Sequence, residues 1–259
     1  MEFIQSKQNQ RIKNYRKLQT SKGRQQGQAY LIEGDHLIQE AIKAKLSLEC
    51  VLLTPEYQAK HPEMNQVVQD LDLTVLQVSD EVLQSLALTE TAQGIMAVVK
   101  QSLIDLQGSD FKINGNRYLL CDRVQDPGNL GTMIRTADAA NFDGVILSQG
   151  CVDPFNDKVI RASQGSLWHL PIIQASDLDI YQAIKSNQLK IFATALHQSA
   201  CDYRQVAGQA GVLVVGNEGQ GVSHFWLEQA DQLIYIPMPG QAESLNVAIA
   251  AGILMFAWI

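Results

Sequence analysis

The chain has 259 residues, of which 46% are hydrophobic, 18% charged and 7% aromatic. This composition excludes a disordered or fibrous protein, and the length suits one large domain or two ordinary ones. The formal net charge is −7, yet residues 1–30 carry seven basic side chains against one acidic side chain. An acidic protein is a poor general binder of nucleic acid, so phosphate contact is expected first at this basic N-terminal segment.

The cysteines and the termini bear on where the protein resides. Cys50, Cys121, Cys151 and Cys201 are far apart, without a C-x-x-C pair or a neighbouring histidine cluster. This spacing predicts free thiols, no zinc site and a cytoplasmic location. The N-terminus lacks the charged and apolar regions of a signal peptide. Residues 245–259 are almost wholly apolar but shorter than the ~20 residues of a membrane span, so we expect a buried helix there and no membrane partner.

The first part of the chain alternates short apolar runs with helical patterns. Near the N-terminus Ile12, Tyr15 and Leu18 recur at helical spacing among basic residues, which predicts an amphipathic helix. On charge alone, its basic face is more simply a solvated surface than a binding site. Further on, strands are predicted at 30–32, 48–53, 73–78 and 95–99, and helices at 35–45, 55–71 and 80–86. The polar residues 107–117, with two glycines, are the predicted linker.

The second part has longer apolar runs. Strands are predicted at 118–121, 144–147, 191–194, 211–215 and 233–236, and helices at 129–140, 155–163, 178–187, 223–229 and 244–259. Continuous Val, Leu and Ile runs separated by helices predict an α/β fold with a mainly parallel sheet that is covered on both faces. We therefore expect two α/β domains, a smaller one over residues 1–106 and a larger one over residues 118–259. Ligands of such sheets bind beyond the carboxyl ends of the strands, and three loops there are unusual.

The first unusual loop, Asp126-Pro-Gly-Asn129, opens a predicted helix. Its Pro-Gly pair is typical of a turn, and we expect Asn129 to be the helix N-cap. Apolar residues then recur at i, i+3, i+4 and i+7 and predict the buried face: Leu130, Met133, Ile134 and Ala137. Arg135 falls outside this face. It is either a residue that binds a phosphate or carboxylate through two hydrogen bonds or an ordinary surface arginine. Asn141 is expected in the left-handed conformation that ends the helix.

The second unusual loop is Gly216-Asn217-Glu218-Gly219-Gln220-Gly221. Three glycines after an apolar strand allow the backbone to approach a ligand closely, although glycine clusters are also simple turn signals. The loop matches neither the dinucleotide-binding nor the nucleoside-triphosphate fingerprint.

The third unusual loop runs from Ile236 to Asn246 and contains two prolines and a glycine. Ser244 is the expected N-cap of the last helix. That leaves Asn246 as a polar residue in the first turn of a helix expected to be buried, where its amide needs a polar partner. The sequence contains no G-x-S-x-G elbow and no His/Glu pair at metal-ligand spacing, which disfavours a hydrolase or a metalloenzyme.

Taken together and in this order, the three loops resemble the SpoU (TrmH-type) family of RNA ribose 2′-O-methyltransferases in the SPOUT superfamily, over essentially all of residues 118–259. The motifs are Asp126-Pro-x-Asn129-x-Gly131-x-x-x-Arg135-Thr-Ala, Gly216-x-Glu218-x-x-Gly221, Ile236-Pro-Met-x-x-x-x-x-Ser244-Leu-Asn246-Val and Arg161-Ala-Ser163-x-Gly165-Ser-Leu. Each motif alone is weak, but the four in register make a specific match. The basic segment and Tyr30-Leu-Ile-Glu33-Gly34 resemble the family's RNA-binding N-terminal domain, which is similar to kink-turn-binding ribosomal proteins.

The resemblance implies a methyl transfer from S-adenosylmethionine to a ribose 2′-hydroxyl, without a metal. It also implies a deep trefoil knot in the C-terminal domain and a homodimer with the active site between the subunits. The implied catalytic residues are Arg135, Asn129, Glu218, Ser244 and Asn246. The implied cofactor-binding residues are Thr194, Gly216, Asn217, Ile236 and Leu245. The implied RNA contacts are Arg11, Lys13, Arg16, Lys17, Arg24 and Arg161.

The role of Arg135 stays open between two alternatives. The family's arginine is often assigned as the general base, but a guanidinium is almost always protonated in proteins. Alternatively, Arg135 grips the adjacent phosphate and stabilises the developing alkoxide while another group or water accepts the proton.

Two other classes of function compete with the methyltransferase. A catalytically silent RNA-binding or ribosome-assembly module has no need of Arg135, Glu218, Ser244 and Asn246 together, and an ordinary nucleotide-binding enzyme is disfavoured by the missing fingerprints. The two-domain layout resembles the ribosomal RNA branch of the family, so large-subunit ribosomal RNA is favoured over transfer RNA as the acceptor. The nucleotide that is methylated and its base stay open.

Overall fold

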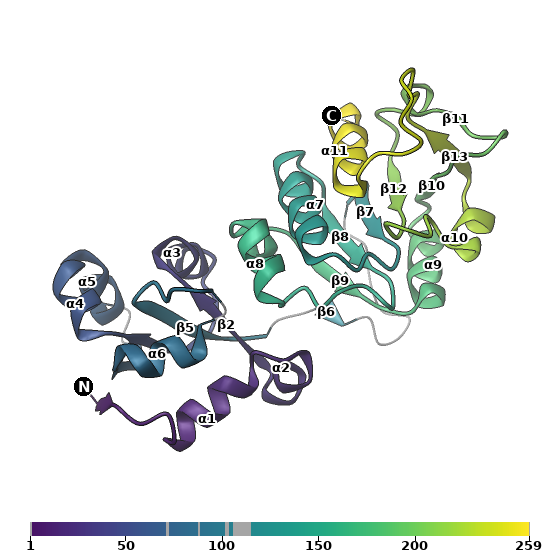
Figure 1. Cartoon of the computed structure of the whole chain (residues 1–259). Coiled ribbons are helices and arrows are strands. Elements are labelled where there is room, and N and C mark those ends of the chain that lie inside the picture. The colour runs from purple at the N-terminus through teal and green to yellow at the C-terminus, as the bar shows by residue number, and fades with distance from the viewer. Residues whose placement is uncertain (1, 71–72, 88, 102–103, 106–114, 259) are drawn as a thin grey trace. The chain divides into compact units, whose positions relative to one another are not determined.

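The computed structural model describes residues 2–70, 73–87, 89–101, 104–105 and 115–258. It divides into two compact units, each with one β-sheet (Figure 1). The first unit comprises Met1–Ser102 with Phe155–Arg161, and the second comprises Leu103–Pro154 with Ala162–Ile259. Most of the predicted linker, residues 107–114, lies outside the described residues.

The first unit contains a mixed five-stranded sheet in the order β1-β4-β3-β5-β2. Its strands are β1 (Glu2–Ile4), β2 (Ala29–Glu33), β3 (Leu48–Leu53), β4 (Val75–Val78) and β5 (Ile95–Lys100). β1, β4 and β3 run parallel, whereas β5 is antiparallel to β3 and β2. The helices are α1 (Gln10–Lys17), α2 (Ser21–Gly27), α3 (Asp35–Lys43), α4 (Pro55–Lys60), α5 (Pro62–Asp70) and α6 (Asp80–Leu86).

Two helical predictions in this unit have different outcomes. The amphipathic helix is confirmed as α1, which buries Ile12 and Tyr15. The single helix expected over 55–71 is wrong, because the chain forms α4 and α5 with a break between them. Pro62 opens α5 and disfavours the helical conformation at the residue before it. His61 accordingly has φ −125° and ψ 66°.

The second unit contains an eight-stranded sheet in the order β11-β13-β10-β12-β7-β8-β9-β6. Every strand pair in it is parallel, which confirms the predicted parallel sheet. The strands are β6 (Ile104–Asp105), β7 (Arg117–Cys121), β8 (Gly144–Leu147), β9 (Ile172–Gln174), β10 (Lys190–Thr194), β11 (Cys201–Asp202), β12 (Gly211–Val215) and β13 (Gln232–Tyr235). The helices are α7 (Pro127–Ala139), α9 (Asp177–Ser186), α10 (His224–Gln229) and α11 (Val247–Ala257), whereas most of α8 (Asp157–Ser163) belongs to the first unit. The sequence pattern did not predict β6, β9 and β11.

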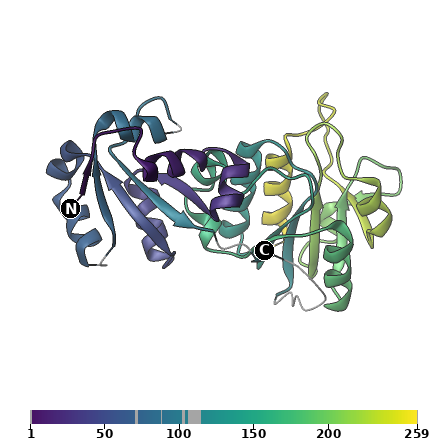
Figure 2. The same cartoon turned by 90° about the horizontal axis from the view of Figure 1, so that it is seen from below.

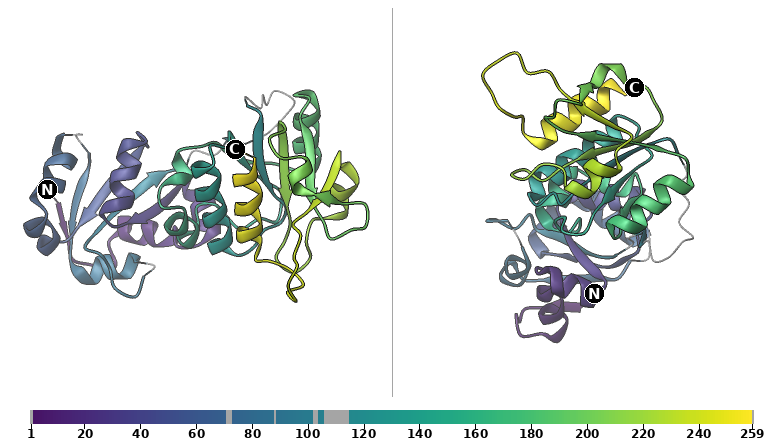
Figure 3. Two further views of the ribbon diagram at one scale, coloured as in Figure 1. Left: turned by 90° about the horizontal axis from the view of Figure 1, so that it is seen from above. Right: turned by 90° about the vertical axis from the view of Figure 1, so that its right-hand side faces the viewer.

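Helices cover both faces of the second sheet (Figures 2 and 3). On one face α9 and α10 pack on alternate strand residues, and the fully buried Trp226 of α10 belongs to this core. On the other face α7 and α11 lie side by side. The ring of Trp258, directly after α11, meets Phe192 of β10 edge to face. α11 has 11 residues, and no helix in the described part of the chain is long and apolar enough to span a membrane.

The start of α7 differs from the prediction. Asp126 Oδ1 accepts the backbone N–H of Asn129 at 2.8 Å, so Asp126 is the N-cap and the Asn129 cap is wrong. Pro127 suits the first helical position because it has no N–H to leave unpaired. The Asn129 side chain therefore lies in the first turn, free to bond elsewhere. At the other end Asn141 has φ 53°, which confirms the predicted left-handed residue.

The start of α11 also differs from the prediction. Asn246 Oδ1 accepts the backbone N–H groups of Ala248 at 2.9 Å and Ile249 at 3.2 Å, so Asn246 caps the helix. Ser244 lies two residues too early to reach these groups, and the Ser244 cap is wrong. The expected burial of this helix holds for one face, which includes Ala251 and Leu254, whereas Ile249, Ile253 and Phe256 are exposed.

Candidate active site

The sheet order brings two of the unusual loops together. β12, β7 and β8 are neighbours, and parallel strands end at the same edge. The loop after β7 is residues 122–126, and the loop after β12 is residues 216–223. Polar side chains from both loops meet at this edge, as open α/β sheets provide for their ligands.

Glu218 joins the two loops. Its Oε1 accepts the backbone N–H of Asp126 at 3.0 Å and the side-chain amide Nδ2 of Asn129 at 3.1 Å. Its Oε2 accepts the backbone N–H of Gln125 at 3.3 Å. Burial raises the pKa of the Glu218 carboxyl group, but these hydrogen bonds outweigh burial, so that its pKa lies below the ordinary value. Glu218 is therefore a poor proton acceptor at neutral pH and a fixed negative charge at the mouth of the site.

Asn129 extends this connection to the third loop. Its Oδ1 accepts Nδ2 of Asn246 at 3.0 Å, while Asn246 caps α11 through its own Oδ1. The polar partner expected for Asn246 is thus Asn129, although Asn246 is exposed rather than buried. Glu218, Asn129 and Asn246 form one hydrogen-bonded chain that links the three sequence motifs.

The Gly216–Gly221 loop is folded back tightly on itself. Asn217 and Gly221 exchange two backbone hydrogen bonds of 3.0 and 2.9 Å. A Cβ at Gly216 would lie 2.1 Å from backbone atoms of Gly221 and Val222, so only glycine fits there. Asn217 stabilises the turn, since its Oδ1 accepts the N–H groups of Gly219 and Gln220.

The other expected cofactor residues are less tightly connected. Thr194 ends β10 and donates its hydroxyl to Val214 O on β12 at 3.1 Å. Ile236 follows β13 and is half-buried, whereas Ser244 and Leu245 are exposed in the loop before α11. The Ser244 hydroxyl makes no hydrogen bond to Glu218, Asn129 or Asn246 in the described part of the chain.

Arg135 is exposed and lies outside the buried face of α7, as predicted. Its side chain makes no hydrogen bond or ion pair with any described residue. It is six residues beyond Asn129, which is about 9 Å along the helix and about 120° around it. Arg135 therefore lies on a different side of α7 from Asn129.

The basic residues of the first unit are not equivalent. Lys13 and Lys17 are exposed on α1, Arg11 pairs with Glu2 at 2.8 Å, and Arg16 donates to Ser85 Oγ at 3.1 Å. Arg24 is only 3% exposed and donates to Leu18 O at 3.0 Å, so its expected role as an RNA contact is wrong. Arg161 is half-exposed and pairs with Asp157.

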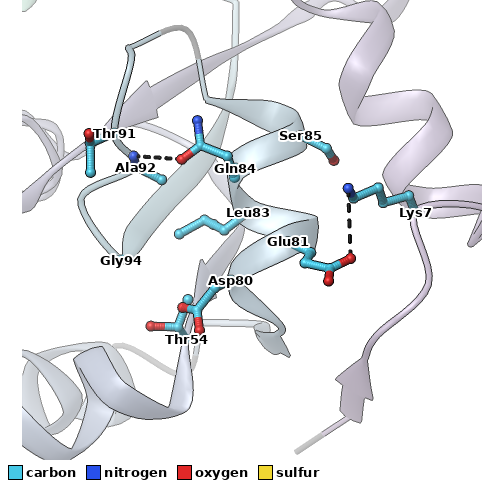
Figure 4. A pocket seen from close by; sticks show the side chains of 10 residues that line it. All are labelled: Lys7, Thr54, Asp80, Glu81, Leu83, Gln84, Ser85, Thr91, Ala92 and Gly94. Carbon is cyan, nitrogen blue, oxygen red and sulfur yellow. Dashed lines mark hydrogen bonds and ion pairs between the residues drawn. The ribbon is translucent and has the colours of Figure 1, made fainter.

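A pocket of about 500 Å³ lies in the first unit beside α6 (Figure 4). Lys7 on its wall pairs with Glu81 at 3.8 Å, and Gln84 Oε1 accepts the N–H of Ala92 at 3.0 Å. Asp80 adds a second carboxylate to the lining. The two carboxylates oppose phosphate binding inside this pocket, so the exposed face of α1 is the better surface for phosphates.

Sequence reasoning missed a cluster behind the Gly216–Gly221 loop. Asp122, Arg123 and Ser148 come from the ends of β7 and β8 and bond to one another. A charged pair directly after an apolar strand was the available signal. The described residues contain no group of three or more His, Cys, Asp or Glu that could hold a metal ion.

Family models match both parts of the chain. The SpoU rRNA Methylase family matches residues 116–256, which hold all three linked loops. The MRM3-like substrate binding domain matches residues 9–97, which include the basic helix α1.

Individual proteins match over nearly the whole chain. The 23S rRNA (guanosine(2553)-2′-O)-methyltransferase RlmP of Bacillus subtilis (strain 168) is 39% identical over 259 residues, covering 99% of this chain and 98% of that protein. The AdoMet-bound rRNA methyltransferase from Sinorhizobium meliloti has a TM-score of 0.88 at 31% identity and covers 99% and 96% of the two chains. The SpoU methyltransferase AviRb from Streptomyces viridochromogenes, solved with AdoMet, has a TM-score of 0.83 at 26% identity and covers 96% and 97%.

Proposed function

The chain belongs to the SpoU rRNA methylase family, and from this premise we propose that it methylates a ribose 2′-hydroxyl of 23S ribosomal RNA with S-adenosylmethionine as the methyl donor. The observation that carries the proposal is the Glu218–Asn129–Asn246 chain, which joins the three family motifs at the carboxyl ends of β7 and β12. The full-length similarity to RlmP makes the guanosine that its name specifies the first acceptor to test. A ribosomal RNA substrate supports a cytoplasmic location for this activity.

The loops after β12 and β13 are the proposed donor site. A Cβ placed on Gly221 or Gly240 would meet no atom within 4 Å, so the backbone of both loops borders open space. Such backbone fits close contact with an adenine and a ribose. Gly216, Asn217, Ile236 and Leu245 would hold the donor, with Thr194 at the neighbouring strand end. When bound, the donor supplies an activated methyl group on a sulfonium.

The residues of the chain then have three tasks: to orient the acceptor, to exclude misaligned poses and to stabilise charge on the 2′-oxygen. Glu218 and Asn129 hold the loops in place, and Asn246 links them to α11. Ser244, which is exposed in the loop before α11, is a proposed contact of the bound nucleotide. Arg135 grips the phosphate beside the reacting ribose and stabilises the developing alkoxide, because its bidentate fork suits phosphate geometry.

A homodimer completes this site. Ile249, Ile253 and Phe256 follow i, i+4, i+7 spacing on α11 and are 57%, 37% and 54% exposed, with Leu245 nearby at 38%. A contiguous apolar stripe of this kind marks an interaction surface. Arg135 is exposed on the adjacent α7, on a different side of that helix from Asn129, so we propose that a second copy packed on α11 receives it. We expect Ile253→Glu to give monomers in size-exclusion chromatography with light scattering.

The first unit provides the proposed RNA-binding surface. Its match to a substrate binding domain and the exposed basic residues of α1 support this role, and Arg11, Lys13, Arg16, Lys17 and Arg161 are the proposed contacts. The proposed RNA-binding domain is residues 1–106 and the proposed methyltransferase domain is residues 118–259, although Phe155–Arg161 of the latter group with the first unit. Family membership also supports a ribosomal-protein-like fold for the first and a deep trefoil knot in the second.

The deciding experiment maps ribose methylation in the RNA of a strain that lacks the gene. One 23S site should lose its 2′-O-methyl group and regain it when the wild-type gene, but not Arg135→Ala, is restored. The purified protein should transfer a labelled methyl group to the unmethylated 23S RNA. Loss of a transfer RNA methyl group instead would redirect the proposal to that substrate, and an unchanged methylation map would favour a silent RNA-binding module.

A further inference from the structure

A buried carboxylate without a role in the proposed function lies at the centre of the second sheet. Asp122 directly follows β7 and is fully buried. Its Oδ1 accepts Ser148 Oγ at 3.3 Å and Arg123 Nε at 3.2 Å, and its Oδ2 accepts the backbone N–H of Ser223 at 2.6 Å. A buried charge is costly unless it is paired and hydrogen-bonded. These partners come from the ends of β7 and β8 and from the start of α10.

Asp122 is the innermost of three connections between residues 122–126 and the loop after β12. The first is its own bond to Ser223 N, where the loop ends. The second runs from Asn217 Nδ2 to Arg123 O at 2.9 Å. The third is the Glu218 carboxylate, which accepts the N–H groups of Gln125 and Asp126. The connection through Asp122 is the one that is fully shielded from water.

The backbone at Arg123 depends on the same cluster. Arg123 has φ 55°, a left-handed conformation that bulky residues rarely adopt unless their surroundings enforce it. Ser148 Oγ accepts the Arg123 N–H at 2.9 Å, and Asp122 accepts its Nε. This turn directs the following N–H groups toward Glu218.

The start of α10 depends on Asp122 as well. Ser223 is the N-cap residue, but its side chain makes no capping hydrogen bond, and its buried hydroxyl oxygen has no partner among the described residues. The hydrogen bond from the Ser223 N–H to Asp122 Oδ2 therefore fixes the end of the glycine-rich loop.

We propose that Asp122 is a positioning residue for methyl transfer: its buried carboxylate locks the loop of Gly216–Gly221 against residues 122–126, and thereby sets the distance between the donor loop and the Asn129 side of the site. This inference rests on the proposed function, but it assigns a role to a residue that touches neither reactant. Small displacements of this kind can lower rates about 100-fold. RNA binding, which belongs to the first unit, should not depend on it.

The test compares Asp122→Ala and Asp122→Asn with the wild-type dimer. We expect Asp122→Ala to lower kcat about 100-fold and to weaken S-adenosylmethionine binding about tenfold by calorimetry, with an unchanged KM for RNA. Asp122→Asn should recover most of kcat, because its amide oxygen can still accept the Ser223 N–H. Should Asp122→Ala not fold, Ser148→Ala, which removes one hydrogen bond to the carboxylate, should still lower kcat several-fold.

Asp143 provides the matched control. Its Oδ2 also accepts two backbone N–H groups at 2.8 Å, from Asn116 and Arg117, but at the opposite ends of the strands. Asp143→Ala should lower the Tm and leave kcat and donor affinity unchanged. Equal losses of kcat in the two Asp→Ala variants, or full activity in folded Asp122→Ala and Ser148→Ala, would overturn the positioning role. An inactive wild-type protein would instead count against the proposed function itself.

Discussion

Glu218 illustrates how a single residue is tuned for its place. Its carboxylate accepts three hydrogen bonds from residues 125–129, and its pKa is consequently lowered despite partial burial. A carboxyl group whose pKa is lowered on folding adds stability above its unfolded pKa and loses that contribution as the pH falls through its folded pKa. Glu218 therefore stabilises the site at neutral pH and ceases to do so in acid.

Replacing Glu218 by Gln should remove this pH-dependent contribution. We expect Glu218→Gln to lower the free energy of unfolding by about 1 kcal/mol at pH 7. The difference in free energy of unfolding between this variant and the wild type should become smaller as the pH falls below about 4. Urea unfolding at pH 7 and pH 3.5 measures both. Glu243→Gln is the control, since Glu243 is exposed and makes no hydrogen bond to the described residues. An equal effect of both variants would contradict the assigned role of the hydrogen bonds.

Substitutions of Arg135 distinguish a need for its planar guanidinium from a need for positive charge alone. Arg135→Ala should abolish methylation, and Arg135→Lys should retain at most about 1% of kcat, because a lysine cannot grip a phosphate bidentately. Donor binding should stay intact in both, since the proposed partner of Arg135 is the phosphate of the acceptor and not the methyl donor. Single-turnover methylation assays with saturating RNA measure the rate of methyl transfer in each variant. Near-normal turnover of the lysine variant would show that charge alone suffices.

At the scale of the element, Asn246 has two tasks that can be separated. Its Oδ1 caps α11 and its Nδ2 reaches Asn129. Asn246→Asp keeps the capping oxygen but sets an oxygen against Asn129 Oδ1, whereas Asn246→Ala loses both bonds. We expect Asn246→Ala to cost about 1 kcal/mol of stability and Asn246→Asp to cost little, while both lose most activity. Thermal unfolding and methylation assays measure the two effects. An active aspartate variant would remove the Asn129–Asn246 bond from the mechanism.

The helices and strands also show what the sequence could and could not predict. The apolar runs of the strands and the helical spacing in α1 and α7 predict regular elements because burial imposes those periods. The caps were misplaced because several polar residues precede each helix, and only geometry selects Asp126 and Asn246. Arg24 was misassigned because its charge suggests exposure, whereas its guanidinium is buried against a backbone carbonyl. Asp122 was missed because its partners lie 26 and 101 residues away.

At the scale of the whole molecule, the charge asymmetry has a measurable consequence. Arg16→Glu with Lys17→Glu should weaken RNA binding and flatten the slope of log affinity against log salt, because fewer counterions are released. Lys43→Glu with Lys60→Glu makes the same change of charge on α3 and α4 of the same unit and is the control. Filter binding at several salt concentrations provides the slopes. Identical slopes for both double variants would exclude α1 from the RNA interface.

The proposal that two subunits share the active site can be tested by mixing inactive variants. If Arg135 of one subunit acts beside Glu218, Asn129 and Asn246 of its partner, a dimer of one Arg135→Ala chain and one Asn246→Asp chain has one intact site. Random assortment makes half of the dimers mixed, so that about a quarter of wild-type activity returns when the two inactive proteins are unfolded and refolded together. If all four residues act within one chain, each site of the mixed dimer lacks one of them and no activity returns. Arg135→Ala refolded alone is the control, and the measurement is methyl transfer to 23S RNA at equal total protein.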